Sequence, residues 1–178
     1  MQYRRAAVAG GTYFFTVNLA HRTHTHLVDH VTELREVMRK VQRRRPFRID
    51  AMVVLPDHLH ALWTLPAGDA DFATRWMLIK GGFSRGVRVG APHGRGRRSR
   101  RERGLWQRRY WEHLIRNPDD YGRHVAYIHH NPVKHGYVPS AVDWPYSSVH
   151  RYVAAGLLPP DWGGGYTEED EFGERHRW

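Results

Sequence analysis

The chain has 178 residues, with 28 Lys and Arg against 18 Asp and Glu, so its formal net charge is +10. This length allows one domain with a tail or a long loop, and the charge indicates a polyanionic partner such as a nucleic acid. The absence of cysteine excludes disulfides, cysteine-bound zinc, iron–sulfur clusters and a thiol nucleophile. With no apolar stretch of membrane length and no signal-peptide pattern, a cytoplasmic location is expected.

The first half of the chain predicts a strand, a helix and two further strands. The aromatic and β-branched run 12–19 predicts the first strand. Apolar residues at helical spacing over 27–41 predict an amphipathic helix, which Pro46 ends. The near-continuous apolar run 49–55 predicts a central strand that is covered on both faces, and 58–65 predicts the strand after it.

The second half predicts a helix, a strand and a last helix. A weaker helical pattern spans 71–87 and is interrupted by Gly81 and Gly82, and the aromatic run 106–115 predicts a strand. Pro118 follows an asparagine and marks the first position of the last helix. The order is β-α-β-β-α-β-α. Its first six elements match the ferredoxin-like (split βαβ) pattern, an α+β fold with an antiparallel sheet and helices on one face.

Two segments stand apart from this pattern. Residues 92–103 are too charged and too rich in glycine to bury, which predicts a basic loop inside the domain. Residues 161–178 have the composition of a C-terminal tail. We therefore expect a single domain over 1–160.

A pair of histidines lies at the start of the predicted strand 58–65. His58 and His60 are two residues apart, so a strand turns both imidazoles to the same face, where they can bind one metal ion. Such a spacing alone is more often a packed or solvated pair. The apolar residues on either side, however, place this pair within the core sheet, where two imidazoles need a reason.

The last predicted helix carries a polar stripe around a tyrosine. On a wheel of about 100° per residue, Asp120, His124 and Asn131 fall within about 60° of Tyr127. An adjoining apolar face is expected to pack on the sheet and consists of Tyr121, Val125, Ile128 and Pro132. Taken alone, this pattern also fits an ordinary amphipathic helix with an exposed tyrosine.

The two patterns together resemble a known family. His58-Leu59-His60 is similar to the HUH motif, and the block from Tyr127, YIHHNPVKHG, resembles the tyrosine helix of single-tyrosine (Y1) HUH transposases. Other blocks in the same order resemble REP-associated tyrosine transposases, relatives of the IS200/IS605 transposases: YRR, GGTYFFTVNL, RPFRIDAMVVLPDHLHALWTLP, WQRRYWEHLIRN and DWPYSS. The resemblance covers about residues 3 to 160 and departs from the family in 92–103, which bears on DNA specificity rather than on chemistry.

The residue types suit phosphodiester chemistry. A tyrosine oxygen can attack a phosphodiester if a metal ion withdraws charge from the phosphate, so Tyr127 is the predicted nucleophile. We assign His58 and His60 as metal ligands with Asn131 as the third, a mixed N/O set that fits Mg²⁺ or Mn²⁺ and also tolerates other divalent ions. The resemblance implies the same roles in a single-stranded DNA endonuclease and strand transferase. Such an enzyme acts on REP-like hairpins, forms a 5′-phosphotyrosine and releases a 3′-OH.

Several assignments stay open at this point. Asp57 either supports His58 or caps the turn, and His113 either lines the site or packs in its strand. One alternative function is a non-catalytic protein of the same fold that binds single-stranded DNA or RNA, although binding alone does not need the histidines and the tyrosine. A second is an unrelated histidine-based hydrolase or metal-binding protein, which leaves the charge unexplained.

DNA contacts are predicted from charge and aromatic content. The family block at the N-terminus is expected to touch bases, the basic loop to touch phosphates, and the aromatic strand with the last helix to add further contacts. These residues are Tyr3, Arg4, Arg5, Arg97, Arg98, Arg100, Arg101, Trp106, Arg108, Arg109 and Lys134. For the aromatic residues, core packing is the alternative. The partner implied is hairpin-bearing single-stranded DNA in a bacterial nucleoid, and a monomer is favoured over a dimer.

Overall fold

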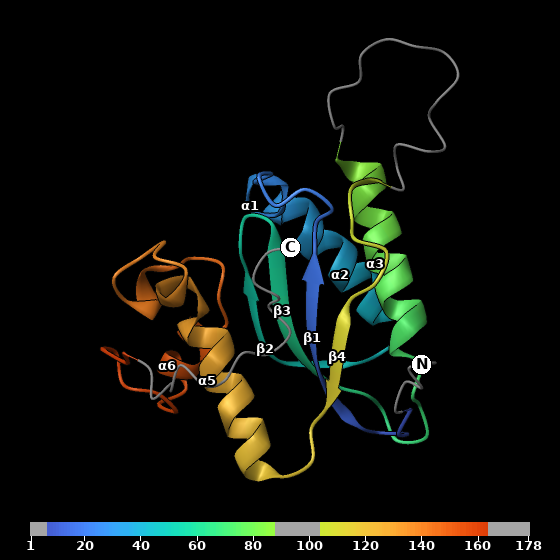
Figure 1. Ribbon diagram of the computed structural model, residues 1–178. Helices are drawn as coiled ribbons and strands as arrows, with labels where there is room; N and C mark the ends of the chain where they lie inside the picture. The colour runs from blue at the N-terminus through green and yellow to red at the C-terminus, as the bar shows by residue number, and fades with distance from the viewer. Residues whose placement is uncertain (1–6, 88–103, 164–178) are drawn as a thin grey trace, which may run out of the picture.

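The computed structural model describes residues 7–87 and 104–163. Figure 1 shows one mixed α and β arrangement built around a sheet. The elements in chain order are β1 (Thr12–Asn18), α1 (His26–Asp29), α2 (Val31–Arg44), β2 (Arg48–Val54), β3 (His58–Thr64), α3 (Phe72–Gly86), β4 (Trp111–Leu114), α5 (Pro118–Lys134), the 3-10 turn η2 (Ala141–Asp143) and α6 (Val149–Ala154).

The four strands form an antiparallel sheet in the order β2-β3-β1-β4. This order, with helices between the first and second strands and between the third and fourth, confirms the predicted ferredoxin-like fold. Because side chains alternate along a strand, β1 turns Tyr13 and Phe15 toward α2 and α3 and turns Phe14 toward α5. The sheet is therefore covered on both sides, by α2 and α3 on one face and by α5 on the other (Figure 1).

β2 is an edge strand, so the prediction of a central strand for this segment was wrong. Its apolar residues are nevertheless covered on both faces of the sheet, because Met52 packs on the α2 side and Ala51 and Val53 pack on the α5 side. Its outer edge is also paired: the Val54 amide donates to the Tyr146 carbonyl at 2.9 Å, and the Ser148 amide donates to the Met52 carbonyl at 2.8 Å. The apolar pattern therefore predicted the burial of β2 correctly, but it predicted the wrong position for this strand in the sheet.

Three predicted element bounds also differ from the structure. The helix predicted over 27–41 is divided at His30 into α1 and α2. The strand predicted over 106–115 is regular only over β4, and Trp106 forms a separate bridge to Leu19. The helix α3 runs unbroken through Gly81 and Gly82, which the sequence predicted to interrupt it. A Cβ at Gly82 would lie 2.7 Å from Cγ1 of Val37 on α2. The glycine thus permits close helix packing.

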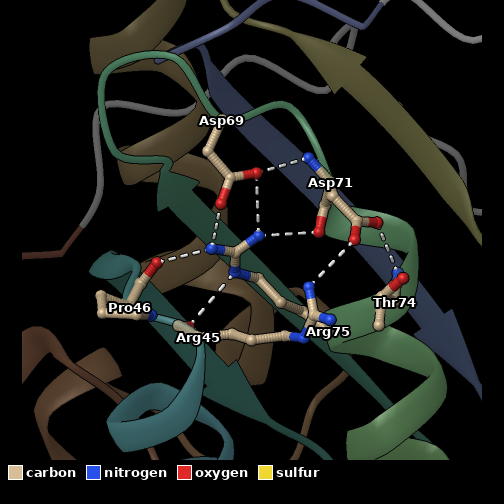
Figure 2. A network of polar contacts seen from close by, with 6 residues as sticks. All are labelled: Arg45, Pro46, Asp69, Asp71, Thr74 and Arg75. Carbon is tan, nitrogen blue, oxygen red and sulfur yellow. Dashed lines mark hydrogen bonds and ion pairs between the residues drawn. The ribbon is translucent and has the colours of Figure 1, made fainter.

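A buried arginine joins the end of α2 to the start of α3 (Figure 2). Arg75 is only 1% exposed and donates to both carboxylate oxygens of Asp69, at 3.2 and 2.6 Å. It also donates to the carbonyls of Pro46, Arg45 and Asp71. Because every side of the guanidinium meets an oxygen, the buried charge is compensated and fixes the two helices relative to each other.

The chain enters and leaves the segment 88–103 at two fixed points. Val87 and Leu105 are both buried in the apolar cluster that α2 and α3 form with the sheet. The Ala20 amide also donates to the Leu105 carbonyl at 2.9 Å. Across the part of the chain that the structure describes, every helix is too short or too polar to span a lipid bilayer.

Candidate active site

The two histidines of the HxH pair lie side by side at the start of β3. Both are fully buried on the sheet face that α5 covers, and their ring centroids are 5.0 Å apart. Antiparallel pairing with β1 sets Asn18 opposite His58 and Thr16 opposite His60. Both imidazoles therefore lie on the same face of the sheet, as the two-residue spacing predicted.

One nitrogen of each imidazole is held by an oxygen. The Nδ1–H of His58 donates to a carboxylate oxygen of Asp57 at 2.7 Å, and Arg22 donates to the other oxygen at 2.7 Å. Burial alone would raise the pKa of Asp57, but the hydrogen bonds from His58 and Arg22 outweigh it and lower the pKa to about 2. Nδ1 of His60 lies 2.9 Å from the Thr16 hydroxyl. These contacts fix both rings and direct Nε2 of His58 away from Asp57.

Tyr127 reaches this pair from α5. The helix begins at the N-cap Asn117, whose side chain accepts from the Asp120 amide, and Pro118 occupies its first turn, as the sequence predicted. Tyr127 is 1% exposed, and its ring centroid lies 5.1 Å from that of His60 and 5.9 Å from that of Phe14. The stripe that carries Tyr127 thus faces the sheet, together with the apolar face predicted beside it.

Three further side chains lie near the end of α5, two on the helix and one at its C-cap. Asn131, one turn after Tyr127, is fully buried on the same side of the helix. Nζ of Lys134 lies 4.9 Å from the centroid of the Tyr127 ring. His135, the C-cap of the helix, lies 5.1 Å from His58 between ring centroids. The end of α5 therefore adds an ammonium at the Tyr127 ring and a third imidazole beside His58, with the Asn131 amide buried on the Tyr127 side of the helix.

The donor set fits a divalent metal ion. Because the ionised Asp57 carboxylate can only accept a hydrogen bond, Nδ1 of His58 carries a proton, and Nε2 is the nitrogen that could bind a metal ion. A carboxylate behind a ligand imidazole is the usual arrangement at protein metal centres. Two imidazole nitrogens with an amide oxygen form a mixed set with room for substrate oxygens. His58, His60 and Asn131 are the residues that would hold such an ion.

A second group with metal-ligand chemistry lies at the start of α5. Asp120 accepts from Nε2 of His113 on β4 at 2.9 Å, and its backbone carbonyl accepts from Nδ1 of His124 at 2.7 Å. Nδ1 of His124 therefore carries a proton and is not a ligand. The rings of His113 and His124 also stack, with their centroids 4.8 Å apart and their planes at 13°.

This group acts instead as a polar link between β4 and α5. Burial would raise the pKa of Asp120, but hydrogen bonds from His113 and the Arg116 amide lower it below the usual value. Burial also lowers the pKa of His124, which keeps that ring neutral. Of the two alternatives for His113, packing in its strand is the one that the structure favours. The link holds the first turns of α5 and thereby positions Tyr127 one turn later.

The structure describes only some of the residues predicted to contact DNA, and these differ in exposure. Arg108 and Arg109 are exposed, and Lys134 lies at Tyr127. Trp106 is 6% exposed and packs against Phe83 on α3, which favours the core-packing alternative for its ring. The remaining predicted contacts lie outside the described residues: Tyr3, Arg4, Arg5, Arg97, Arg98, Arg100 and Arg101.

Three residues at the site were missed from the sequence. Thr16 is set opposite His60 by strand register, and no local pattern gives that register before the sheet is known. Arg22 lies in an irregular segment, where nothing in the sequence signals its contact with Asp57. His135 belongs to the family block YIHHNPVKHG, and that position is the only signal that would have found it.

The chain is similar to known proteins over most of its length. The family model described as "Transposase IS200 like" matches residues 11–131. A REP-associated tyrosine transposase of Escherichia coli (strain K12) is 49% identical over 167 residues, which cover 94% of this chain and 93% of that protein. A protein of Haemophilus influenzae that carries the same description in provisional form is 45% identical, over 91% of this chain and 93% of that protein.

A solved structure is similar over the same extent. It is a REP-associated tyrosine transposase bound to a REP hairpin, with a TM-score of 0.86 and 47% identity. The match covers 100% of this chain and 99% of that one. The chain therefore belongs to the IS200-like transposase family, in its branch of REP-associated tyrosine transposases.

Proposed function

We propose that the protein is a metal-dependent endonuclease and strand transferase that acts on hairpin-bearing single-stranded DNA through Tyr127. The observation that supports this most directly is the contact of the buried Tyr127 ring with His60, at 5.1 Å between centroids, beside the histidine pair. The relatives of the chain are named tyrosine transposases, and the resemblance to HUH transposases implies a divalent metal ion.

The reaction is a transesterification at phosphorus. Oη of Tyr127 attacks a phosphodiester, an O–P bond forms to the tyrosine, and the bond to the 3′ oxygen of the neighbouring nucleotide breaks. The phenolic proton is lost and the leaving 3′ oxygen gains one, so the products are a 5′-phosphotyrosine and a free 3′-OH. Because one ester replaces another, a second strand with a 3′-OH can rejoin the DNA without an external energy source.

Each residue at the site has a defined part in this step. His58, His60 and Asn131 would hold Mg²⁺ or Mn²⁺, which withdraws charge from the phosphate and orients it. Asp57 and Thr16 hold the two imidazoles in place through Nδ1. Lys134 places a positive charge over the Tyr127 ring, where a phenolate and then a phosphotyrosine develop negative charge. Since Tyr127 is 1% exposed, DNA reaches it only after part of its surroundings moves.

The proposed substrate is a REP-like hairpin. The solved relative is bound to a REP hairpin, and this chain matches that relative over its whole length at 47% identity. We also infer that one chain is sufficient for catalysis, because the histidine pair and Tyr127 come together within a single polypeptide. This supports the monomer favoured by the sequence.

Denaturing electrophoresis tests the proposal. The protein is mixed with a labelled single-stranded hairpin oligonucleotide and Mn²⁺, and a covalent protein–DNA adduct is expected. Tyr127→Phe is expected to abolish the adduct and leave binding in native gels nearly intact, because only the nucleophilic oxygen is removed. The matched control Tyr137→Phe, at an exposed tyrosine after the same helix, should form the adduct. An adduct from Tyr127→Phe would assign the nucleophile elsewhere, and a native shift without any adduct would favour the non-catalytic alternative.

A further inference from the structure

The solvent side of α2 concentrates positive charge. Its core residues are Leu34, Met38 and Val41, and on a helical wheel the opposite side centres on Arg39, Lys40 and Arg43. We call this surface the α2 basic face, and its exposed members are Arg35, Arg39, Lys40, Arg43 and Arg44.

Little negative charge compensates this face. Glu36 is the exposed acid within it, and the other acid of the helix, Glu33, lies 3.7 Å from Nδ1 of His30. Among residues 7–87 and 104–163, the ion pairs at this end of the fold use Arg45 and Arg48, with Asp71 and Asp50. Arg35 lies 5.8 Å from the centroid of the Tyr146 ring, and within the described ranges no carboxylate pairs with the other members of the α2 basic face.

The α2 basic face is remote from the catalytic site. α2 packs on the sheet face formed by Phe15, Ala61 and Trp63, whereas Tyr127 packs on the opposite face. Figure 1 shows the sheet between α2 and α5. A strand held at Tyr127 therefore does not account for the charge on α2.

The spacing and composition of the face fit duplex DNA. Arg35, Arg39 and Arg43 recur every four residues, which is about 6 Å along the helix, and Arg44 lies on the other flank. A helix of about 10–12 Å diameter matches a major groove about 12 Å wide, with a phosphate wall on each side. Surfaces for single strands add aromatic platforms for base stacking, and α2 contains no aromatic residue.

We propose that the α2 basic face is a docking surface for the backbone of duplex DNA, which it contacts without reading sequence. This goes beyond the proposed function, because it uses none of the residues of the Tyr127 site and the docked duplex is not cut. A hairpin substrate supplies such a duplex in its stem.

Salt-dependent binding tests the docking surface. Affinity for a fully paired duplex of arbitrary sequence is measured by fluorescence anisotropy at several salt concentrations, for the full chain and for Arg39→Gln/Arg43→Gln. Glutamine keeps helix propensity, and loss of two phosphate contacts is expected to flatten the slope of log K against log salt by about 1.8. The control Arg85→Gln/Arg116→Gln removes two exposed charges elsewhere and should change the slope by less than half as much.

Two comparisons separate the outcomes. Adduct formation on a short single-stranded oligonucleotide should be unchanged in Arg39→Gln/Arg43→Gln. If the parent protein forms no adduct, the proposed function is wrong, but the duplex measurement still tests the docking surface. Equal slopes for the parent and Arg39→Gln/Arg43→Gln would overturn the docking surface. So would an equal loss of affinity for an unstructured single strand, because the face would then bind any backbone. Charge reversal at Arg39 and Arg43 should weaken duplex binding further than neutralisation.

Discussion

The imidazoles of His58 and His60 are each fixed through Nδ1, one by a carboxylate from the preceding turn and one by a hydroxyl from the neighbouring strand. If no ligand binds the pair, burying two polar rings in the sheet core lowers the stability of the fold. The proposed metal ion would give both buried rings a ligand on the same face of the sheet.

Ligand removal is expected to weaken metal binding in a graded way. His58→Ala or His60→Ala should lower Mn²⁺ affinity by more than roughly 10–100-fold, the usual loss when only an outer partner is removed. Asn131→Ala should lower it less, because an amide oxygen is a poorer ligand and water can replace it. Titration calorimetry with Mn²⁺ measures this, and unchanged affinity in either histidine variant would falsify the site.

The carboxylate behind His58 should matter without touching the metal ion. Asp57→Asn is expected to reduce Mn²⁺ affinity by about 10–100-fold, because it removes the charge that fixes and polarises the imidazole. Asp143→Asn removes the same charge from an exposed turn and serves as the control. If both variants bind Mn²⁺ equally well, Asp57 only shapes the turn before β3.

A buried histidine on the far side of α5 predicts acid sensitivity. Burial, Arg151 and His150 lower the pKa of His129 to about 4, from the ordinary 6.5. Since the unfolded chain binds this proton more readily, the contribution of His129 to stability is complete above pH 6.5 and is lost as the pH falls to about 4. The loss is on the order of 3 kcal/mol.

Chemical denaturation across that pH range checks this. The free energy of unfolding of His129→Gln should fall less steeply on acidification than that of the parent protein. His21→Gln, an exposed control, should follow the parent curve. Parallel curves for the parent and His129→Gln would mean that another group controls the acid response.

At the scale of elements, the approach of α3 to α2 depends on Gly82. Gly82→Ala should destabilise the fold by about 1–3 kcal/mol, although alanine is the better helix former, because the added Cβ would lie 2.7 Å from Cγ1 of Val37. Val37→Ala in the same chain should recover most of the loss. Gly86→Ala has open space around its Cβ and should be neutral or stabilising. Thermal unfolding distinguishes these cases, and additive effects of Gly82→Ala and Val37→Ala would contradict the contact.

Some elements could be predicted from neighbouring residues in the chain, and others are set by contacts between distant segments. The N-cap Asn117 with Pro118, and the alternation through His58 and His60, depend on neighbours in the chain, so their structure was predictable. The edge position of β2 and the partnership of Thr16 with His60 depend on strand order and register, which are set by packing between distant segments. The need for glycine at position 82 similarly depends on Val37, 45 positions earlier by residue number.

At the scale of the whole molecule, the basic loop predicts a contribution to DNA binding that is separate from specificity. Residues 92–103 contain six arginines. Replacing them with a neutral linker of equal length should flatten the salt slope for a single-stranded hairpin by about one to two units, or two to three lost phosphate contacts. Preference among hairpin sequences should survive, because phosphate contacts position DNA and base contacts specify it.

Isotherms with cognate and scrambled hairpins across salt concentrations separate the two roles. A linker variant that keeps the parent slope but loses the preference would assign base reading to this segment instead. The base contacts expected of Tyr3, Arg4 and Arg5 stay predictions, as does the division into a domain over 1–160 and a tail.

Val87 and Leu105 anchor the two ends of the connection between α3 and the segment that leads to β4. Both residues are buried in the same apolar cluster, so the body of the fold closes around the exit and the return of the chain. Doubling the length of a connection between such points costs only about 0.6 kcal/mol in closure entropy. We therefore expect the body of the fold to tolerate a connection of different length or composition between Val87 and Leu105, so that a segment from a different family member can be grafted between the same two anchors.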